Sequence, residues 1–317
     1  MTSAVPFTRI AILGDLHGHL QLALCTLARW QRETAIPISA ILLAGDIGTF
    51  TEESQLDSAT RAHAKNNPCE LEFLTQWSMT PPPPWLDAIF QPYPDGLGLT
   101  CPIVMVHGNH EGFAHLATRV NPRRIPSAPV SIDDLPTVDT LERIRYLPSG
   151  WQTTLPSGHT LAGIGGMESG QRRAKYHPLA YIDDNAVQRL LNAPPVDLLL
   201  THQGPAAVQG DHGSPTLDLL LERPFARFWF HGHSTPILSP TQLNHTLVIP
   251  LGDVTFSGRS ADHNPGLSGW CLLDLHADNT HTLHRDPPPF WRDLRRHLWH
   301  QTPGGRLVHP DLAHLAR

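Results

Sequence analysis

Side chains that could bind metal ions recur along this chain in short clusters, most of them beside glycine. Asp15 and His17 stand two residues apart, a spacing that sends both side chains to the same side of an extended chain. Asp46 is a second carboxylate, and its oxygens have enough lone pairs to bridge two cations. The remaining candidate ligands are Asn109, His202 and His233. Mixed Asp, His and Asn ligation suits cations such as manganese, iron or zinc, and two such ions can stabilise both the attacking and the leaving oxygen of a displacement.

Each cluster follows a short apolar run that is typical of a buried strand. The five runs are residues 9–13, 40–44, 102–106, 196–200 and 226–230. Apolar residues at helical spacing predict a helix over 20–30. Because ligand sites in open α/β sheets lie at the carboxyl ends of strands, we expect one sheet to bring these five ends to one site. Three further runs, at 160–164, 246–250 and 269–275, predict a second sheet packed against the first.

The order of the clusters is more specific than any one of them. They read Gly14-Asp15-Leu16-His17-Gly18, Gly45-Asp46, Gly108-Asn109-His110-Glu111, His202 and Gly232-His233. This ordered set resembles the five blocks of the calcineurin-like metallophosphoesterases, over residues 14 to about 235. The resemblance implies an α/β fold, a two-sheet β-sandwich flanked by helices, and metal-dependent hydrolysis of a phosphoester substrate.

The resemblance also implies a role for each matching residue. Two divalent metal ions are expected, manganese first, with iron or zinc as alternatives. Asp15 and His17 would hold the first metal and Asp46 would bridge the two. The ligands of the second metal would be Asn109, His202 and His233. The nucleophile would be a water or hydroxide between the metals.

Two further residues of the third block receive roles of a different kind. His110 would stand beside the leaving-group oxygen, as a general acid or as a stabiliser of the charged transition state. Glu111 would orient a nearby imidazole, or it is a solvated carboxylate in a turn. Neither residue is expected to bind metal directly.

The last block departs from the family pattern. Many members end with Gly-His-x-His, whereas Thr235 stands here in the place of the final histidine. The first metal would then keep Asp15, His17 and Asp46 plus water, or His231 and His233 would form a ligand pair, or the first metal would bind weakly. We favour the first alternative, which leaves His231 behind the ligands or facing the substrate.

The second block bears on the substrate. It runs Gly45-Asp46-Ile47-Gly48-Thr49-Phe50 and lacks the arginine of the protein-phosphatase branch, which argues against a Ser/Thr protein phosphatase. Arg172 and Arg173 follow a glycine-bearing stretch and are candidates for gripping phosphate. A phosphomonoesterase is the expected enzyme. A phosphodiesterase or nuclease is the alternative, and a non-catalytic scaffold on the same fold is a third.

Composition sets the wider expectations. With 40% hydrophobic and 16% charged residues and a net charge of -6, the chain is typical of a globular protein. The charge argues against broad nucleic-acid binding and leaves a local basic patch open. We expect one phosphoesterase domain over 1–279, with insertions at about 51–100 and 121–149, and a Pro/His/Arg-rich tail over 280–317. No signal peptide or long apolar run is present and the four cysteines form no CxxC pair, so a cytoplasmic protein without a membrane partner is expected.

Overall fold

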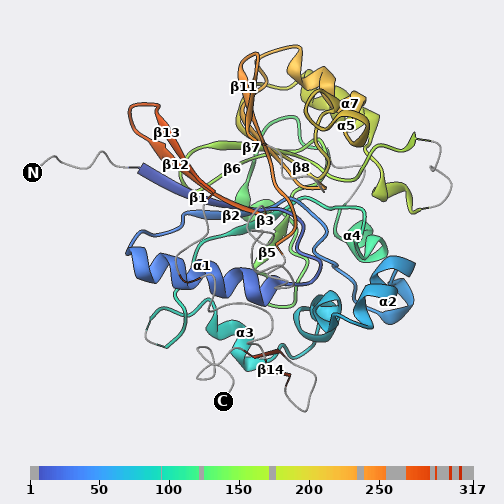
Figure 1. Ribbon diagram of the computed structural model, residues 1–317, viewed down its shortest axis with the longest axis vertical. Helices are drawn as coiled ribbons and strands as arrows, with labels where there is room; N and C mark the ends of the chain where they lie inside the picture. The colour runs from blue at the N-terminus through green and yellow to red at the C-terminus, as the bar shows by residue number, and fades with distance from the viewer. Residues whose placement is uncertain are drawn as a thin grey trace, which may run out of the picture.

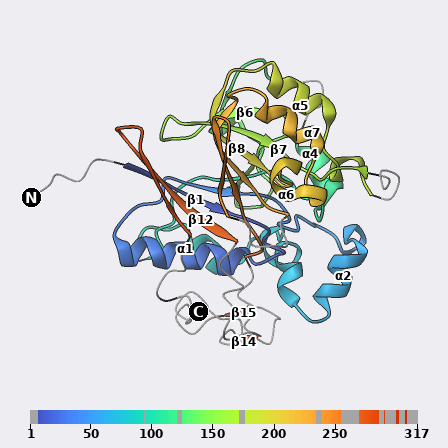
Figure 2. The same cartoon turned by 45° about the horizontal axis from the view of Figure 1, so that its top comes forward.

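Two β-sheets lie face to face and helices cover their outer faces (Figures 1 and 2). The computed structural model describes residues 7–93, 95–120, 125–170, 176–233, 239–254, 269–285, 290, 300–301 and 307–308. Within these ranges the predicted fold class, an α/β sandwich of two sheets flanked by helices, is confirmed.

The first sheet has six strands in the order β13-β12-β1-β2-β3-β5. Four of them are parallel: β1 (Phe7–Leu13), β2 (Ala40–Leu43), β3 (Ile103–Met105) and β5 (Ile144–Tyr146). The two others, β12 (Trp270–His276) and β13 (His281–His284), add antiparallel strands on the free side of β1. Because β13 pairs with β12, the sheet includes residues 281–284, which belong to the segment predicted as a tail over 280–317.

The second sheet has seven strands in the order β10-β11-β9-β8-β7-β6-β4. Its parallel centre consists of β7 (Thr160–Ile164), β8 (Val196–Thr201), β9 (Ala226–His231) and β11 (Thr246–Pro250). The outer strands are β4 (Val130–Ser131), β6 (Gln152–Thr154) and β10 (Thr241–Leu243). A separate antiparallel pair is formed by β14 (His300–Gln301) and β15 (Leu307–Val308).

The partition of strands between the sheets differs from the prediction. The five site-bearing strands do not share one sheet, because β1, β2 and β3 lie in the first and β8 and β9 in the second. The run at 269–275, predicted for the second sheet, forms β12 in the first. The reason is that strands buried on both faces are apolar throughout, so their sequences carry no signal of which sheet they join.

Alternation along β1 shows how the layers are held together. Ile10 and Ile12 pack between the two sheets, against side chains such as Phe228 of β9. Ala11 and Leu13 point the other way, into the core under α1 (Leu20–Thr34). These four side chains are fully buried. Burial of one large aliphatic side chain, such as that of Ile10, stabilises the fold by roughly 1.5–3 kcal/mol.

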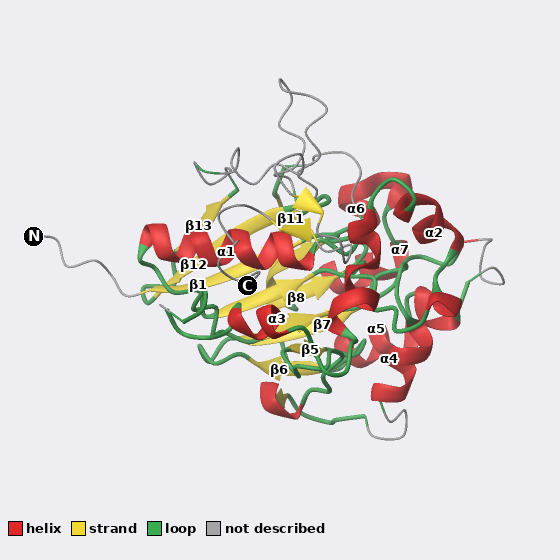
Figure 3. Ribbon diagram, turned by 90° about the horizontal axis from the view of Figure 1, so that it is seen from below, coloured by secondary structure: helices red, strands yellow, loops and turns green. Residues whose placement is uncertain are grey.

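Helices cover both outer faces of the sandwich. Figure 3 shows α1 and α3 (Pro84–Ala88) across the first sheet, while α5 (Asp184–Leu191) and α7 (Pro215–Asp218) pack on the second. The other α-helices are α2 (Ser58–Ala64), α4 (Phe113–Arg119) and α6 (Ala206–Gln209). The short 3₁₀ and π turns are Glu53–Gln55, Pro68–Leu71, Phe73–Trp77, Ile132–Asp134, Pro178–Ala180, Gly210–His212 and Leu219–Leu221. No helix of the described part has the length and apolar character needed to cross a membrane.

The two predicted insertions are integral to the fold. The segment 51–100 contains α2 and α3, and its Phe73 and Trp77 are fully buried in the core under the first sheet. The segment 121–149 supplies β4 to one sheet and β5 to the other. Both segments therefore contribute to the packing of the sandwich as well as to its surface.

Candidate metal centre

The predicted ligands follow strand ends that come from both sheets. Asp15 and Asp46 lie just beyond β1 and β2, and His202 and His233 just beyond β8 and β9. Each of these four side chains offers a ligand atom within 4.8 Å of the others. The structure thus brings together candidates that are up to 218 residues apart in the sequence.

Left-handed backbone conformations recur at these positions. His17, Asp46 and His233 have φ angles of 43°, 49° and 51°. Such angles are uncommon outside glycine, although Asp and His are among the residues that tolerate them. Residues held in sparsely populated backbone regions cluster at functional sites, where the surrounding structure over-determines them.

Two glycines of the motifs are required by close packing on the carboxylates. A Cβ atom at Gly108 would collide with Asp46 Oδ1, and one at Gly232 would collide with Asp15 Oδ1. In addition, the His233 amide donates to both oxygens of Asp15, at 3.0 and 3.1 Å. The glycines before Asn109 and His233 therefore let the backbone approach the two carboxylates and fix their orientation.

The hydrogen bonds of His202 determine which of its ring nitrogens is free. Nδ1 lies 2.8 Å from the carbonyl oxygen of Ala44, which can only accept, so Nδ1 carries the proton and Nε2 presents a lone pair. That lone pair faces Asn109 Oδ1 at 2.9 Å and Asp46 Oδ1 at 3.6 Å. Three electron-rich atoms converge here, an arrangement that a bound cation would satisfy.

Burial keeps the imidazoles of this group neutral. Burial lowers the pKa of His202. For His233, burial and the electrostatic repulsion that a protonated ring would meet from His202 lower the pKa to about 4. Neutral imidazole is the form that binds metal. Both rings, 4.9 Å apart between centroids, are therefore in their ligating form at neutral pH.

Asp46 lies between two sets of potential ligands. Its Oδ1 faces His202, while its Oδ2 lies 3.8 Å from His17 Nε2. A carboxylate placed in this way can bind one cation through each oxygen, as the bridging role requires.

A second group of potential ligands adjoins the first. Asp15, His17 and Asp253 offer ligand atoms that lie within 4.8 Å of one another. Burial and the neighbouring carboxylates Asp46 and Asp253 raise the pKa of Asp15. Burial and the charge of Asp46 also raise the pKa of Asp253, against the opposing effect of His17. Carboxylates concentrated in this way repel one another, so the donor set fits divalent cations.

The family model described as calcineurin-like phosphoesterase matches residues 8–235. This match covers most of the chain and includes all six predicted metal ligands. The chain belongs to the calcineurin-like phosphoesterases. A comparison with curated proteins found no match. Family membership and the clustered donors together support a metal-dependent phosphoesterase.

In this phosphoesterase His110 stands at the margin of the centre. Its amide donates to Asp46 Oδ1 at 2.8 Å, and its Nδ1 lies 2.9 Å from Asp57 Oδ2. Burial lowers the pKa of His110, but the hydrogen bond with Asp57 and the charge of Asp46 outweigh it and raise the pKa to about 9. The imidazolium form of His110 is thus stabilised, and its Nδ1 makes the hydrogen bond to Asp57.

Asp57 is held in place by its own helix. It is the N-cap residue of α2, and its Oδ1 accepts from the amides of Ala59 and Thr60 at 2.8 and 2.9 Å. The other oxygen, Oδ2, accepts from the Thr60 hydroxyl at 2.9 Å and faces His110. The cap therefore orients Asp57, and Asp57 in turn orients the imidazole.

Glu111 has a role other than either of those expected. Its buried carboxylate accepts from the amides of Ile47 and Thr49, at 3.0 and 2.8 Å, and from the Thr49 hydroxyl at 2.7 Å. The carboxylate is therefore buried and not solvated, and these hydrogen bonds join it to backbone amides and a hydroxyl and not to an imidazole. Instead it ties the loop that carries Asp46 to the loop that carries Asn109.

The segment 51–100 packs directly against the first metal-binding loop. A Cβ at Gly18 would collide with the Cys69 carbonyl, and Glu72 Oε1 accepts from the Gln21 amide at 2.7 Å. These contacts bring Glu70 Oε2 to 3.8 Å from His17 Nδ1. The segment therefore supplies carboxylates to the edge of the centre.

The remaining predicted site residues are not among these groups. His231 is completely buried, and its ring packs where a Cβ of Gly204 would lie. Its Nδ1 is 3.0 Å from the Gly232 carbonyl, so it stays a predicted supporting residue behind the ligands. Arg172, Arg173 and Thr235 lie outside the described residues.

Three acidic residues of the site were not predicted from the sequence: Asp57, Glu70 and Asp253. A signal existed for Asp253, because Gly252-Asp253 follows the apolar run of β11 just as Gly14-Asp15 and Gly45-Asp46 follow theirs. Asp57 and Glu70 lie far from any strand end. Only the folded position of segment 51–100 brings them to the centre.

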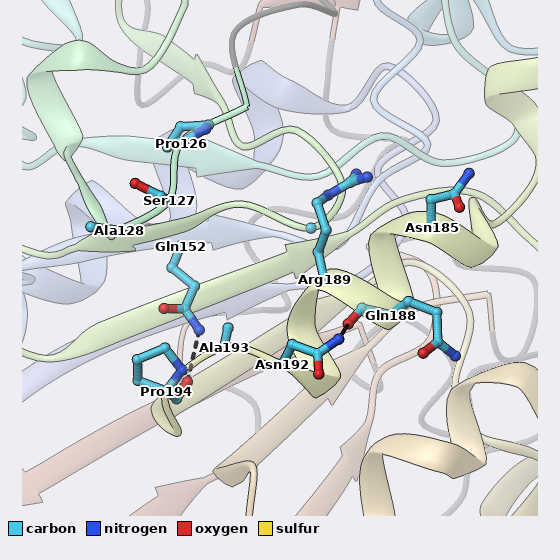
Figure 4. Close-up of a pocket in the computed structure, with 11 residues that line it drawn as sticks. Pro126, Ser127, Ala128, Gln152, Asn185, Gln188, Arg189, Asn192, Ala193 and Pro194 are labelled. Atoms are coloured by element: carbon cyan, nitrogen blue, oxygen red, sulfur yellow. Dashed lines mark hydrogen bonds between the residues drawn. The ribbon is translucent and has the colours of Figure 1, made fainter.

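Two cavities border the second sheet. The one in Figure 4 has a volume of about 490 Å³, and its lining includes several carboxamides, of which Gln152 donates to the Pro194 carbonyl and Asn192 to that of Gln188. The other, of about 780 Å³, reaches His107. Neither lining contains a predicted metal ligand or His110, so the donor set and not cavity size marks the site of chemistry.

Proposed function

We propose that this phosphoesterase is a phosphomonoesterase that works with two divalent metal ions, manganese first. The observation that carries the proposal is the His202 lone pair, which faces Asn109 Oδ1 and Asp46 Oδ1. Together with the second group around Asp15 and His17, this geometry supports two adjoining metal sites that share Asp46.

The ligand roles follow from position in the two groups. Asp15 and His17 would hold one ion, and Asp46 would bridge. The other ion would be held by Asn109, His202 and His233. When bound, the two ions would polarise the phosphoryl oxygens and lower the pKa of an attacking water.

His110 is the proposed general acid. Burial opposes protonation of the ring, but the hydrogen bond to Asp57 stabilises the protonated form. With Nδ1 directed at Asp57, the Nε2 proton is the one that can pass to the leaving-group oxygen. Asp57 would act through His110 as a positioning residue and would hold the charge of the ring.

Acidic side chains around the metal centre favour a small phosphomonoester over a polynucleotide as the substrate. Asp57, Glu70 and Asp253 surround the His17 and His110 side of the centre. A polynucleotide brings further phosphates, which basic side chains normally neutralise. Carboxylates in these positions would repel them, whereas the bound metals would offset this repulsion for the single phosphoryl group of a monoester.

Paired assays on p-nitrophenyl phosphate and bis-p-nitrophenyl phosphate test the proposal, each with manganese or with a chelator. We expect manganese-dependent turnover that is faster on the monoester, and loss of turnover in His110→Ala. The exposed His245 provides a matched control, since His245→Ala should leave turnover unchanged. Faster turnover of the diester would replace the monoesterase with the phosphodiesterase alternative, and metal-independent turnover would contradict the mechanism.

A further inference from the structure

The segment after β11 runs tightly alongside the end of β1. Asp253 and Asp15 form a parallel β-bridge, and the Val254 amide donates to the Asp15 carbonyl at 2.8 Å. A Cβ at Gly14 would collide with the Gly252 carbonyl. The backbone of Asp253 is therefore fixed in register with that of a predicted metal ligand.

This register brings the Asp253 carboxylate to the first metal-binding group. A ligand atom of Asp253 lies within 4.8 Å of ligand atoms on Asp15 and on His17. Asp253 is exposed, and no donor in the described part of the chain makes a hydrogen bond to its carboxylate. By contrast, the Asp15 carboxylate is buried and already accepts from the His233 amide.

The sequence leaves a coordination position open on this side of the centre. Thr235 stands where a further histidine ligand would be expected, and a threonine hydroxyl is a poor substitute for imidazole. We propose that Asp253 supplies this ligand and completes the first metal site with Asp15, His17 and Asp46. The inference rests on the two-metal centre of the proposed function.

The two sites would then differ in chemical character. Three carboxylates and one imidazole would surround the first ion, whereas the second would have one carboxylate, one carboxamide and two imidazoles. Oxygen ligands suit hard cations such as manganese, and imidazole suits zinc and iron. The first site is thus the manganese-selective half of the centre.

Metal titration of the full chain tests the assignment without relying on activity. Manganese binding is measured by calorimetry and by metal analysis for the wild type, Asp253→Ala and Asp253→Asn. We expect two equivalents in the wild type and, in both variants, one equivalent bound as before and one at least about tenfold weaker. The asparagine variant keeps the shape of the side chain, so it reports on the ligand if the alanine variant fails to fold.

Two further variants sharpen the result. Asp253→His restores a ligand and should keep two equivalents, with zinc affinity raised relative to manganese. Asp278→Asn removes an exposed carboxylate from the turn between β12 and β13, beside the start of β1 and so at the end opposite Asp15, and should change nothing. Two unweakened equivalents in Asp253→Asn and Asp253→Ala would overturn the inference and leave the proposed function standing. Absence of metal binding by the folded wild type would overturn both.

Discussion

The two halves of the metal centre are built in different ways. On the side of Asp46, His202 and His233, the ligands follow strand ends, Asp46 and His202 are buried and His233 is partly buried, and backbone groups hold them in place. On the side of His17 and Asp253, the residues also follow strands, β1 and β11, but their side chains are more exposed. Burial and backbone hydrogen bonds therefore preorganise one half, while the ligands of the other half remain open to solvent.

Removal of the residue shared by both halves should have the largest effect. Asp46→Asn takes away the charge between His202 and His17, so neither half keeps its full donor set. We expect turnover to fall by at least about 100-fold, with metal content reduced from two equivalents. Metal analysis beside steady-state kinetics checks this, and loss of only one equivalent would show that the halves are independent.

Removal of His110 should separate chemistry from metal binding. Its side chain belongs to neither group of ligands, yet it stands beside both. His110→Ala is expected to lower kcat by about 10²- to 10⁴-fold with two metal equivalents retained. A fall in metal content as large as that of Asp46→Asn would instead place His110 among the ligands.

Asp57 tests whether segment 51–100 contributes to catalysis. Asp57→Asn keeps an N-cap for α2 and removes the charge that faces His110. We expect kcat to fall by about tenfold to 100-fold, by analogy with other residues that orient a functional imidazole, with KM little changed.

A double-mutant cycle distinguishes this role from a structural one. In the His110→Ala background, Asp57→Asn should cause no further loss of kcat, since its effect passes through the ring. An equal further loss in that background would mean that Asp57 acts on the fold and not through His110.

The smallest effect on activity is expected far from both halves, at the pair Arg9–Asp274. Arg9 Nε and Nη2 each lie 2.6 Å from an oxygen of Asp274, and the pair is buried. Arg9→Ala should lower the free energy of unfolding by about 3 kcal/mol at neutral pH and leave kcat unchanged. Urea unfolding and steady-state kinetics measure the two quantities, and a change in kcat would show that the sandwich and the centre are coupled.

The pair also has a defined pH dependence. Burial raises the pKa of Asp274, but the hydrogen bonds from Arg9 and His284 outweigh it and lower the pKa below that of the unfolded chain. The stabilisation is therefore present above the unfolded pKa and is lost as the pH falls through the folded pKa. The cost of Arg9→Ala should shrink correspondingly in acid, and an equal cost in acid would show that lost packing dominates.

The same contrast between the halves explains what the sequence could predict. The strands beneath Asp15, Asp46 and His202 were recognisable because each is a short apolar run followed by a polar turn, a purely local pattern. The assignment of strands to sheets was not, since β1 and β8 are apolar on both faces and either sheet would bury them.

Residues outside that pattern needed the folded chain. Asp57 reads as a helix cap, a local role that it does have, and nothing local indicates that its second oxygen faces His110. Glu111 sits beside a ligand in the sequence, but its donors lie 62 and 64 residues earlier. Long-range pairings of this kind depend on loop packing, which composition and periodicity do not encode.

Metal stoichiometry measured in parallel with turnover tests whether two metal ions are needed for hydrolysis. The protein is stripped with a chelator, manganese is returned in steps, and bound metal and hydrolysis of p-nitrophenyl phosphate are followed together. We expect two equivalents to bind per chain, with turnover absent in the stripped protein and complete only after the second equivalent binds. Full turnover by stripped protein, or folded protein that binds no divalent metal, would contradict it.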